Sequence, residues 1–270
     1  MQKKMANEPS NQTFSTSSTP KTAVQTVLIS QPPPTTEKSP YHELAKKFEL
    51  QIDFRPFIEI QPVTAREFRK QKINILDHTA IIFTSKNAVD HFFALAKVLR
   101  VEVPEDMKYF CVSEQTANYL QRYIILRKRK VFVGERTSQD LQRLFVKHKK
   151  EKYLFPCSDI RKDDISEFMK ANNIALTEAV IYCTVASDLK DIEIGKYDMI
   201  AFFSPSGVKS LLHNFPNFEQ KNTRIAAFGP TTAQAVRDLN LRLDIEAPMP
   251  NAPSMTGAIE VYLQSFYSNK

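Results

Sequence analysis

The chain has 270 residues, of which 42% are hydrophobic and 25% are charged, and 37 basic against 30 acidic residues give it a formal net charge of +7. That length and apolar content suffice for two ordinary globular domains. No apolar run approaches the length of a bilayer span, and three widely separated cysteines without metal-type spacing are typical of free thiols in a reducing, cytoplasmic compartment.

The first part of the chain, residues 1–23, is predicted to be a disordered tail. Ser, Thr, Asn, Lys and Gln dominate it, so it cannot bury enough apolar surface to offset the entropy of ordering. It also lacks the apolar core of a secretory signal.

Short runs rich in Val, Ile and Phe follow the tail, and we expect them to be strands. In chain order they are residues 27–30, 52–60, 80–84, 109–112, 131–133, 153–156, 178–182, 199–203, 225–228 and 243–247. Stretches with helical periodicity separate most of them: Ala88, Val89 and Phe92 share one face, as do Val208 and Leu211. Strands that are apolar on both faces and alternate with helices predict parallel sheets covered by helices.

The two halves of the chain resemble each other. The segment 83–89, FTSKNAV, reads like 202–208, FFSPSGV, and 112–117, VSEQTA, reads like 228–233, FGPTTA. An internal repeat with so long a period predicts duplicated domains. We expect two similar α/β domains with a cleft between them, and that cleft is where a site should be sought.

Two extended segments, 54–60 and 179–185, interrupt the alternation, one in each half. If the halves are duplicates, these segments are equivalent and can run side by side between the domains. The chain then crosses the hinge twice. We therefore expect one discontinuous domain made of residues 24–56 and 186–270, and an inserted domain made of residues 57–185.

Several common enzyme sites are missing from the sequence. Its five glycines form no glycine-rich dinucleotide or nucleoside-triphosphate loop, its five histidines have no metal-site spacing, and there is no nucleophile elbow. Two basic runs, 127–130 and 147–150, are most simply solvated helix ends. A nucleic-acid patch lacks stacking aromatics, and attraction of a polyanionic small molecule fits equally well.

Hydroxyl-bearing residues stand where the predicted strands end and helices begin. Taken singly, each is best explained as a helix N-cap that contributes about 1 kcal/mol. Taken together, they surround the carboxyl ends of parallel strands, where ligands bind, and helix N-termini there favour anions. We therefore predict a ligand with several negative groups and the binding residues Ser85, Thr116, Ser204, Ser206, Thr231 and Thr232.

Tyr182 lies in the proposed linker, beside the predicted cleft. A Tyr in an alternating strand is more often half-buried packing than a catalyst. The cations near predicted turns are each best explained as solvated surface charges: Lys86, Arg161, Lys162, Lys209 and Arg224.

The segments 202–208 and 226–236, with Ala247-Pro248 and 253–256, resemble the uroporphyrinogen-III synthase family. In the first half, 83–89 is similar to the family's TS-x-x-AV turn, and 154–158 and 180–185 follow in the expected order. The resemblance runs from about Val24 to the C-terminus. The chain departs from the family where Ser30-Gln31-Pro32 replaces a Thr-Arg-Pro-like triplet, and where Ser113 replaces the glycine of the repeated turn.

This resemblance implies two small flavodoxin-like α/β domains joined by a two-stranded antiparallel linker. It implies a lyase of haem and porphyrin biosynthesis that converts linear hydroxymethylbilane into uroporphyrinogen III. Water is lost and the last pyrrole ring is inverted, through an azafulvene and a spiro intermediate, without a metal or organic cofactor. Such an enzyme is expected to be a cytoplasmic monomer with no nucleic-acid or membrane partner, able to receive its substrate from the upstream deaminase.

The resemblance also implies residue roles. Tyr182 would assist departure of the hydroxyl group, and the six hydroxyl residues named above would hold the eight carboxylates of the substrate. Two alternatives remain open on the sequence alone. One is a non-catalytic two-domain binding or sensor protein for a tetrapyrrole or another polyanion, and the other is a nucleic-acid-associated regulator that uses the basic runs.

Overall fold

The computed structural model describes residues 23–36, 38–125, 127, 129–135, 137–161 and 163–268. The predicted tail, residues 1–23, lies outside this described part apart from its last residue. Among the described residues, no helix combines the length and apolar character that crossing a membrane requires. The chain divides into two compact units, residues 1–59 with 186–270 (unit 1) and residues 60–185 (unit 2).

Unit 1 contains a five-stranded sheet in which all strands run parallel, with the order β11-β10-β9-β1-β2. Numbered along this unit alone, the order is 2-1-3-4-5, that of flavodoxin-like folds. The strands are β1 (Thr26–Ile29), β2 (Gln51–Phe54), β9 (Met199–Phe202), β10 (Arg224–Phe228) and β11 (Ile245–Ala247).

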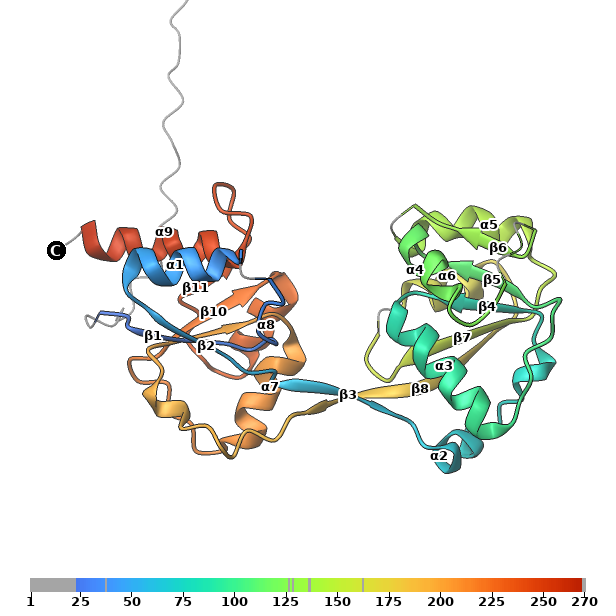
Figure 1. Cartoon of the computed structure of the whole chain (residues 1–270), viewed down its shortest axis with the longest axis horizontal. Helices are drawn as coiled ribbons and strands as arrows, with labels where there is room; N and C mark the ends of the chain where they lie inside the picture. The colour runs from blue at the N-terminus through green and yellow to red at the C-terminus, as the bar shows by residue number, and fades with distance from the viewer. Residues whose placement is uncertain are drawn as a thin grey trace, which may run out of the picture. The chain divides into compact units, whose positions relative to one another are not determined.

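Helices cover both faces of the unit 1 sheet. α1 (Pro40–Phe48) and α9 (Met255–Ser268) pack side by side on one face (Figure 1). α7 (Pro205–Asn214) and α8 (Pro230–Asp238) pack on the other. A short 3₁₀ turn, η3 (Ile194–Lys196), precedes β9. Because both faces are covered, the central strands β1 and β9 are buried along almost their whole length, as the sequence pattern predicts, whereas the edge strands β2 and β11 carry exposed polar residues.

Unit 2 contains a six-stranded sheet with the order β3-β8-β7-β4-β5-β6, and the five strands from β8 to β6 run parallel. On one face lie α2 (Ala65–Lys70), α3 (Lys86–Leu99) and α4 (Glu114–Leu120), and on the other lie α5 (Gln142–Lys147) and α6 (Asp164–Ala171). Two 3₁₀ turns, η1 (Ile75–Asp77) and η2 (Ser138–Leu141), complete the unit. The strands are β3 (Ile58–Pro62), β4 (Ala80–Phe83), β5 (Lys108–Cys111), β6 (Val131–Val133), β7 (Tyr153–Ser158) and β8 (Leu176–Ala186).

The predicted antiparallel linker is confirmed as the pair β3 and β8. The Val63 N–H donates to the Ile181 carbonyl and the Ser187 N–H to the Phe57 carbonyl, so the residue numbers run in opposite directions. The predicted single strand 52–60 is wrong, because β2 ends at Phe54 and β3 begins at Ile58. Pro56 lies in the interruption, where its missing N–H cannot extend a ladder.

The predicted duplication is visible in the two sheets. Read from β8, the order β8-β7-β4-β5-β6 of unit 2 matches the order β2-β1-β9-β10-β11 of unit 1. The strands β4 and β9 therefore occupy equivalent places, as do β5 and β10, and these are the strands that precede the two repeated sequence segments. The connections are permuted, because β4, the first of these five strands along unit 2, is equivalent to β9, the third strand of unit 1.

Three predictions about cations need correction. Arg224 is fully buried at the start of β10, with its guanidinium 5.7 Å from the Phe266 ring centroid. Arg161 pairs with Glu178 and is largely covered. In the run 127–130, the described residues 127, 129 and 130 lie between α4 and β6 and end no helix, whereas Lys147 does end α5 as predicted. In the first two cases a side chain that is distant in the sequence, Phe266 or Glu178, takes the place of water around the charge. The sequence spacing did not reveal these contacts.

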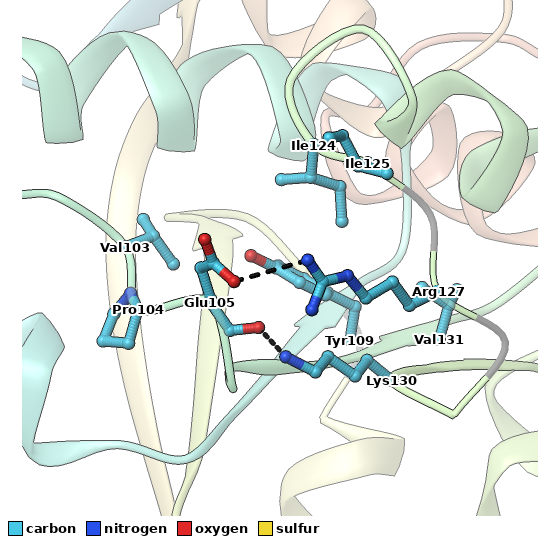
Figure 2. Close-up of a pocket in the computed structure, with 9 residues that line it drawn as sticks. All are labelled: Val103, Pro104, Glu105, Tyr109, Ile124, Ile125, Arg127, Lys130 and Val131. Atoms are coloured by element: carbon cyan, nitrogen blue, oxygen red, sulfur yellow. Dashed lines mark hydrogen bonds and ion pairs between the residues drawn. The ribbon is translucent and has the colours of Figure 1, made fainter.

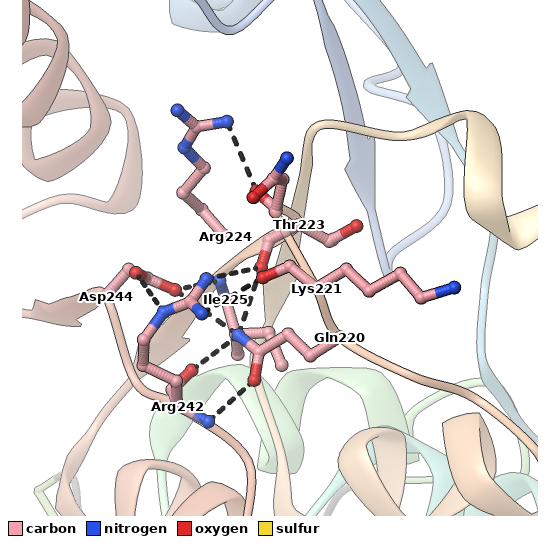
Figure 3. A network of polar contacts seen from close by, with 8 residues as sticks. Gln220, Lys221, Thr223, Arg224, Ile225, Arg242 and Asp244 are labelled. Carbon is pink, nitrogen blue, oxygen red and sulfur yellow. Dashed lines mark hydrogen bonds and ion pairs between the residues drawn. The ribbon is translucent and has the colours of Figure 1, made fainter. Parts of the chain in front are cut away.

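A polar network holds the amino ends of β10 and β11 (Figure 3). Arg242 Nε donates to Asp244 Oδ1 at 2.8 Å, and the Asp244 side chain is only 2% exposed. Asp244 Oδ2 accepts from the Ile225 N–H at 2.9 Å, and Gln220 Nε2 donates to the Arg242 carbonyl at 2.8 Å. This network is structural, since it stands at the end of the sheet opposite the helix N-termini.

Candidate functional site

In unit 1, three helices begin just beyond the carboxyl ends of β9, β10 and β11. Ser204 caps α7 by accepting the Gly207 N–H at 3.1 Å. Ser254 accepts the Gly257 N–H at 3.1 Å in the first turn of α9, which the sequence interpretation did not include in the site. α8 starts after Gly229, whose φ of 87° favours glycine. Three positively polarised helix ends thus meet the edge where ligands bind.

In unit 2, α3 and α4 begin in the same way after β4 and β5. Ser85 Oγ accepts the Ala88 N–H at 3.1 Å, and Ser113 Oγ accepts the Thr116 N–H at 3.3 Å. Ser113 has an extended backbone with φ −148°, so it differs from its repeat equivalent Gly229 in conformation as well as in side chain. The serine caps α4 with its own hydroxyl, which glycine cannot do.

The six predicted hydroxyl residues fall into two groups. Thr116 and Thr232 occupy equivalent third helical positions and are only 4% and 1% exposed. Thr116 Oγ1 lies 3.2 Å from Ser113 Oγ, within hydrogen-bond distance. The other four remain at least partly accessible to solvent: Ser85, Ser204, Ser206 and Thr231.

A β-bulge determines where Tyr182 points. Cys157 pairs with Val180, but Ser158 pairs with Tyr182, so Ile181 is an extra residue in β8. Regular alternation would place Tyr182 on the face of Val180, which packs with the α5 and α6 cluster. Instead, Ile181 and Tyr182 both join the cluster on the α3 face. The bulge therefore turns the phenol toward the N-terminus of α3.

Tyr182 is 8% exposed, and burial is the main reason why the pKa of its phenol is raised above the ordinary value. A hydrogen-bonding interaction with the Ser85 hydroxyl opposes this shift and lowers the pKa. Ser85 therefore interacts with Tyr182 as well as with α3, because its oxygen also accepts the Ala88 N–H at 3.1 Å.

His91 packs against the Tyr182 ring from the second turn of α3. The ring centroids are 5.0 Å apart and the planes are inclined by 30°. Burial lowers the pKa of His91 below its usual range, and the neighbouring Asp90 opposes this shift. The Asp90 carboxylate also accepts the Tyr119 hydroxyl at 2.8 Å and the Tyr123 hydroxyl at 2.6 Å. The sequence interpretation missed His91, because only the bulge in another element brings Tyr182 to it.

Lys86 places a cation beside this group of side chains. It is the first residue of α3, directly after Ser85, and is exposed. Its Nζ lies 5.6 Å from the Tyr119 ring centroid. The charge is therefore held near the helix N-terminus, where it adds to the attraction of an anion.

Both units place these residues near the topological switch point of their sheets. In unit 1, Ser204 follows β9, whose neighbour is β1. In unit 2, Ser85 follows β4, whose neighbour is β7. Sheets of this order bind ligands in the crevice where these neighbouring strands end. Among the described residues, no group of three His, Cys, Asp or Glu side chains could hold a metal ion.

Two hollows lie at the opposite, amino ends of the strands. One, of about 200 Å³, is lined by Tyr109 and Val131, and by Glu105, which pairs with Arg127 at 3.4 Å (Figure 2). The other, of about 600 Å³, is formed mainly by the loop 217–223 in unit 1. Neither contains the predicted hydroxyl residues or Tyr182. The candidate site at the carboxyl ends rests on the helix N-termini there and on the environment of Tyr182.

Comparison with known proteins agrees with this arrangement. Residues 39–257 match the sequence model of a family described as uroporphyrinogen-III synthase HemD. A uroporphyrinogen-III synthase from Chlorobaculum parvum is 24% identical over 255 residues, which cover 87% of this chain and 98% of that protein.

Solved structures share the fold. The crystal structure of uroporphyrinogen-III synthetase from Helicobacter pylori aligns with a TM-score of 0.56 and 18% identity, covering 89% of this chain and 99% of that one. A mutant uroporphyrinogen III synthase from Thermus thermophilus aligns with a TM-score of 0.52 and 16% identity over the same shares. The resemblance seen in the sequence is therefore confirmed, and the chain belongs to the uroporphyrinogen-III synthase family.

Proposed function

We propose that this chain is a uroporphyrinogen-III synthase, a lyase that closes linear hydroxymethylbilane to uroporphyrinogen III with loss of water and inversion of the last ring. The observation that carries the proposal is the environment of Tyr182 in a chain of this family. Its buried phenol has a pKa above the ordinary value, interacts with the Ser85 hydroxyl and is stacked by His91. It lies at the carboxyl end of a parallel sheet, beside a helix N-terminus.

The carboxylates of the substrate suit the helix N-termini that each unit presents at the carboxyl ends of its own sheet. We assign them to free N–H groups and accessible hydroxyls at the starts of α7 and α8, including Ser204, Ser206 and Thr231, with Lys86 adding charge in unit 2. The buried Thr116 and Thr232 instead fix the first turns of α4 and α8. Because binding is spread over many groups, a single hydroxyl substitution should have a modest effect.

The proposed reaction begins when Tyr182 donates its proton to the leaving hydroxyl of the substrate. The C–O bond breaks as a pyrrole nitrogen pushes electrons, and water and an azafulvene result. The substituted carbon of the last ring attacks the azafulvene carbon to give a spiro intermediate. One C–C bond of this intermediate breaks, and the inverted ring recloses through its free carbon. The proton lost from that carbon returns to the Tyr182 phenolate, so the protein mainly positions the substrate and moves one proton.

The raised pKa of Tyr182 suits this role. A phenol whose pKa lies above its ordinary value is fully protonated at neutral pH. It can therefore serve as a proton donor in every turnover. The helix N-terminus and Ser85 then stabilise the phenolate that forms transiently.

The test is a cyclisation assay with freshly generated hydroxymethylbilane, followed by oxidation and chromatographic separation of the porphyrin isomers. Unaided closure gives the type I isomer, so enzyme-dependent type III supports the proposal. Folded protein that yields type I alone would contradict it and favour the tetrapyrrole-binding alternative. Tyr182→Phe should fold normally and lower the rate of type III formation. An unchanged rate would remove Tyr182 from the mechanism.

We further propose that the chain works as a cytoplasmic monomer that receives its substrate from the enzyme producing hydroxymethylbilane. The free Cys111, buried with its pKa raised to about 12 by that burial, is consistent with a reducing compartment. The spontaneous loss of substrate to the type I isomer favours rapid transfer. Sedimentation equilibrium would test the monomer, and a dimer at assay concentrations would contradict it.

A further inference from the structure

Three features fix Tyr182 in unit 2, and two of them come from one helix. The bulge in β8 turns the side chain toward the α3 face. Ser85, the N-cap of α3, interacts with the phenol oxygen, and His91 stacks on the ring. The phenol is thus held at its tip and on its face by the same rigid element.

The contact on the face adds a restraint that the hydrogen bond lacks. A Tyr side chain turns about two bonds, and its outer torsion is broad. A hydrogen bond at the tip fixes the oxygen but leaves the plane of the ring free to tilt. A stacked aromatic neighbour favours one plane. The direction of the O–H bond, which lies near that plane, therefore depends on His91.

The chemistry of His91 suits a stacking role. Because burial lowers its pKa, the imidazole is neutral and needs no counter-ion at neutral pH. The neighbouring Asp90 is engaged by the hydroxyls of Tyr119 and Tyr123, at 2.8 Å and 2.6 Å. The Asp90 carboxylate is therefore bonded to side chains from α4 and from the loop after α4.

The fold itself does not demand a ring at this position. In the repeat, Ser85 corresponds to Ser204, and the same offset takes His91 to Ser210 in α7. Ser210 is buried, and its hydroxyl donates to the Phe57 carbonyl. The duplicated helix thus packs equally well with a small residue at the equivalent place. The ring at position 91 belongs to the half of the chain that carries Tyr182.

We propose that His91 is a positioning residue for Tyr182: its stacked ring holds the phenol hydroxyl in the orientation from which it donates to the departing hydroxyl of the substrate. This inference rests on the proposed function and adds a residue to its mechanism. His91 acts through Tyr182 and has no contact with the substrate in this scheme.

The test compares His91→Ala and His91→Phe in the full-length chain by steady-state formation of the type III isomer. His91→Ala should lower kcat about three- to tenfold and leave KM within about twofold, because binding groups are untouched. His91→Phe keeps a flat ring and should restore most of kcat. Should His91→Ala fail to fold, His91→Leu fills the space without a planar ring and should show the same loss.

A double-variant cycle separates positioning from general packing. In the Tyr182→Phe background there is no hydroxyl to orient, so adding His91→Ala should cause no further loss of kcat. An equal loss in both backgrounds, a loss confined to KM, or a His91→Phe variant as poor as His91→Ala would each overturn the inference. Thermal unfolding of every variant is the control for stability.

The outcome for the parent protein distinguishes the two proposals. Type III formation by the parent with an unaffected His91→Ala variant would overturn the role of His91 alone. Absence of type III formation by the folded parent would overturn the proposed function and, with it, this inference.

Discussion

The hydroxyl of Ser85 has two tasks that one substitution can separate. Its oxygen caps α3 by accepting the Ala88 N–H at 3.1 Å, and the same hydroxyl interacts with the Tyr182 phenol. Ser85→Ala removes both. Loss of the cap should lower the free energy of unfolding by about 1 kcal/mol. Loss of the bond to Tyr182 should remove about 1 kcal/mol of orientation in the transition state, which is roughly a fivefold lower kcat.

The assay is type III isomer formation at saturating substrate, with denaturant unfolding measured on the same preparations. Ser85→Thr keeps the hydroxyl and should retain most of kcat and most of the free energy of unfolding. Thr64→Ala is the matched control in the same unit, because Thr64 caps α2 by accepting the Glu67 N–H at 3.2 Å and its hydroxyl bonds the Glu67 carboxylate. It should lower stability by a similar amount without a change in kcat.

The reasoning would be refuted if Ser85→Ala lost as much stability as Thr64→Ala but kept full turnover. Ser85 would then be a helix cap only, and the proton of Tyr182 would be oriented by some other group. A loss of turnover that Ser85→Thr does not restore would point to packing at the start of α3 and not to the hydroxyl.

Three further outcomes are expected. Asp244→Asn weakens the buried pair with Arg242 and should lower the free energy of unfolding by about 2 kcal/mol in denaturant titrations, with the isomer ratio unchanged. Gly229→Ala should also lower the free energy of unfolding by about 2 kcal/mol, because the φ of 87° and ψ of 151° at this position suit glycine alone. A Cβ there meets no atom within 4 Å, so the expected loss comes from the backbone, and unchanged stability would show that the turn relaxes. Since burial raises the pKa of Tyr182, its phenol loses its proton only as the pH rises above the ordinary tyrosine range. The ratio of parent to Tyr182→Phe rates should therefore hold as the pH approaches the ordinary tyrosine pKa of about 10, and a fall well below that pH would assign the proton to another group.

Much of the architecture could be predicted from the sequence because it depends on local patterns. Apolar runs on both faces indicated parallel strands, and the repeat of 83–89 at 202–208 indicated two similar domains. The serines at those repeats proved to be helix caps, as their residue type favours. Where the prediction of one strand across 52–60 was wrong, Pro56 was the residue that a closer reading of backbone chemistry could have used.

The candidate site was only partly predictable, for the same physical reason in each case. Burial depends on what packs over a residue, so the sequence could not separate the covered Thr116 and Thr232 from the exposed Thr231. The sequence predicted that Arg224 is a surface charge, but in the structure its guanidinium lies beside the ring of Phe266 in α9. Such contacts join residues that are distant along the chain.

The sequence by itself determined the duplicated α/β plan, the family and the presence of a tyrosine near the carboxyl end of a strand, since these follow from periodicity and from the order of short motifs. The tertiary structure alone decided what that tyrosine can do. The bulge at Ile181 overrides the two-residue alternation of β8 and carries Tyr182 to the face where Ser85 and His91 lie. A bulge depends on how two strands pair. The sequence of β8 alone therefore does not show which of its residues is left unpaired opposite β7.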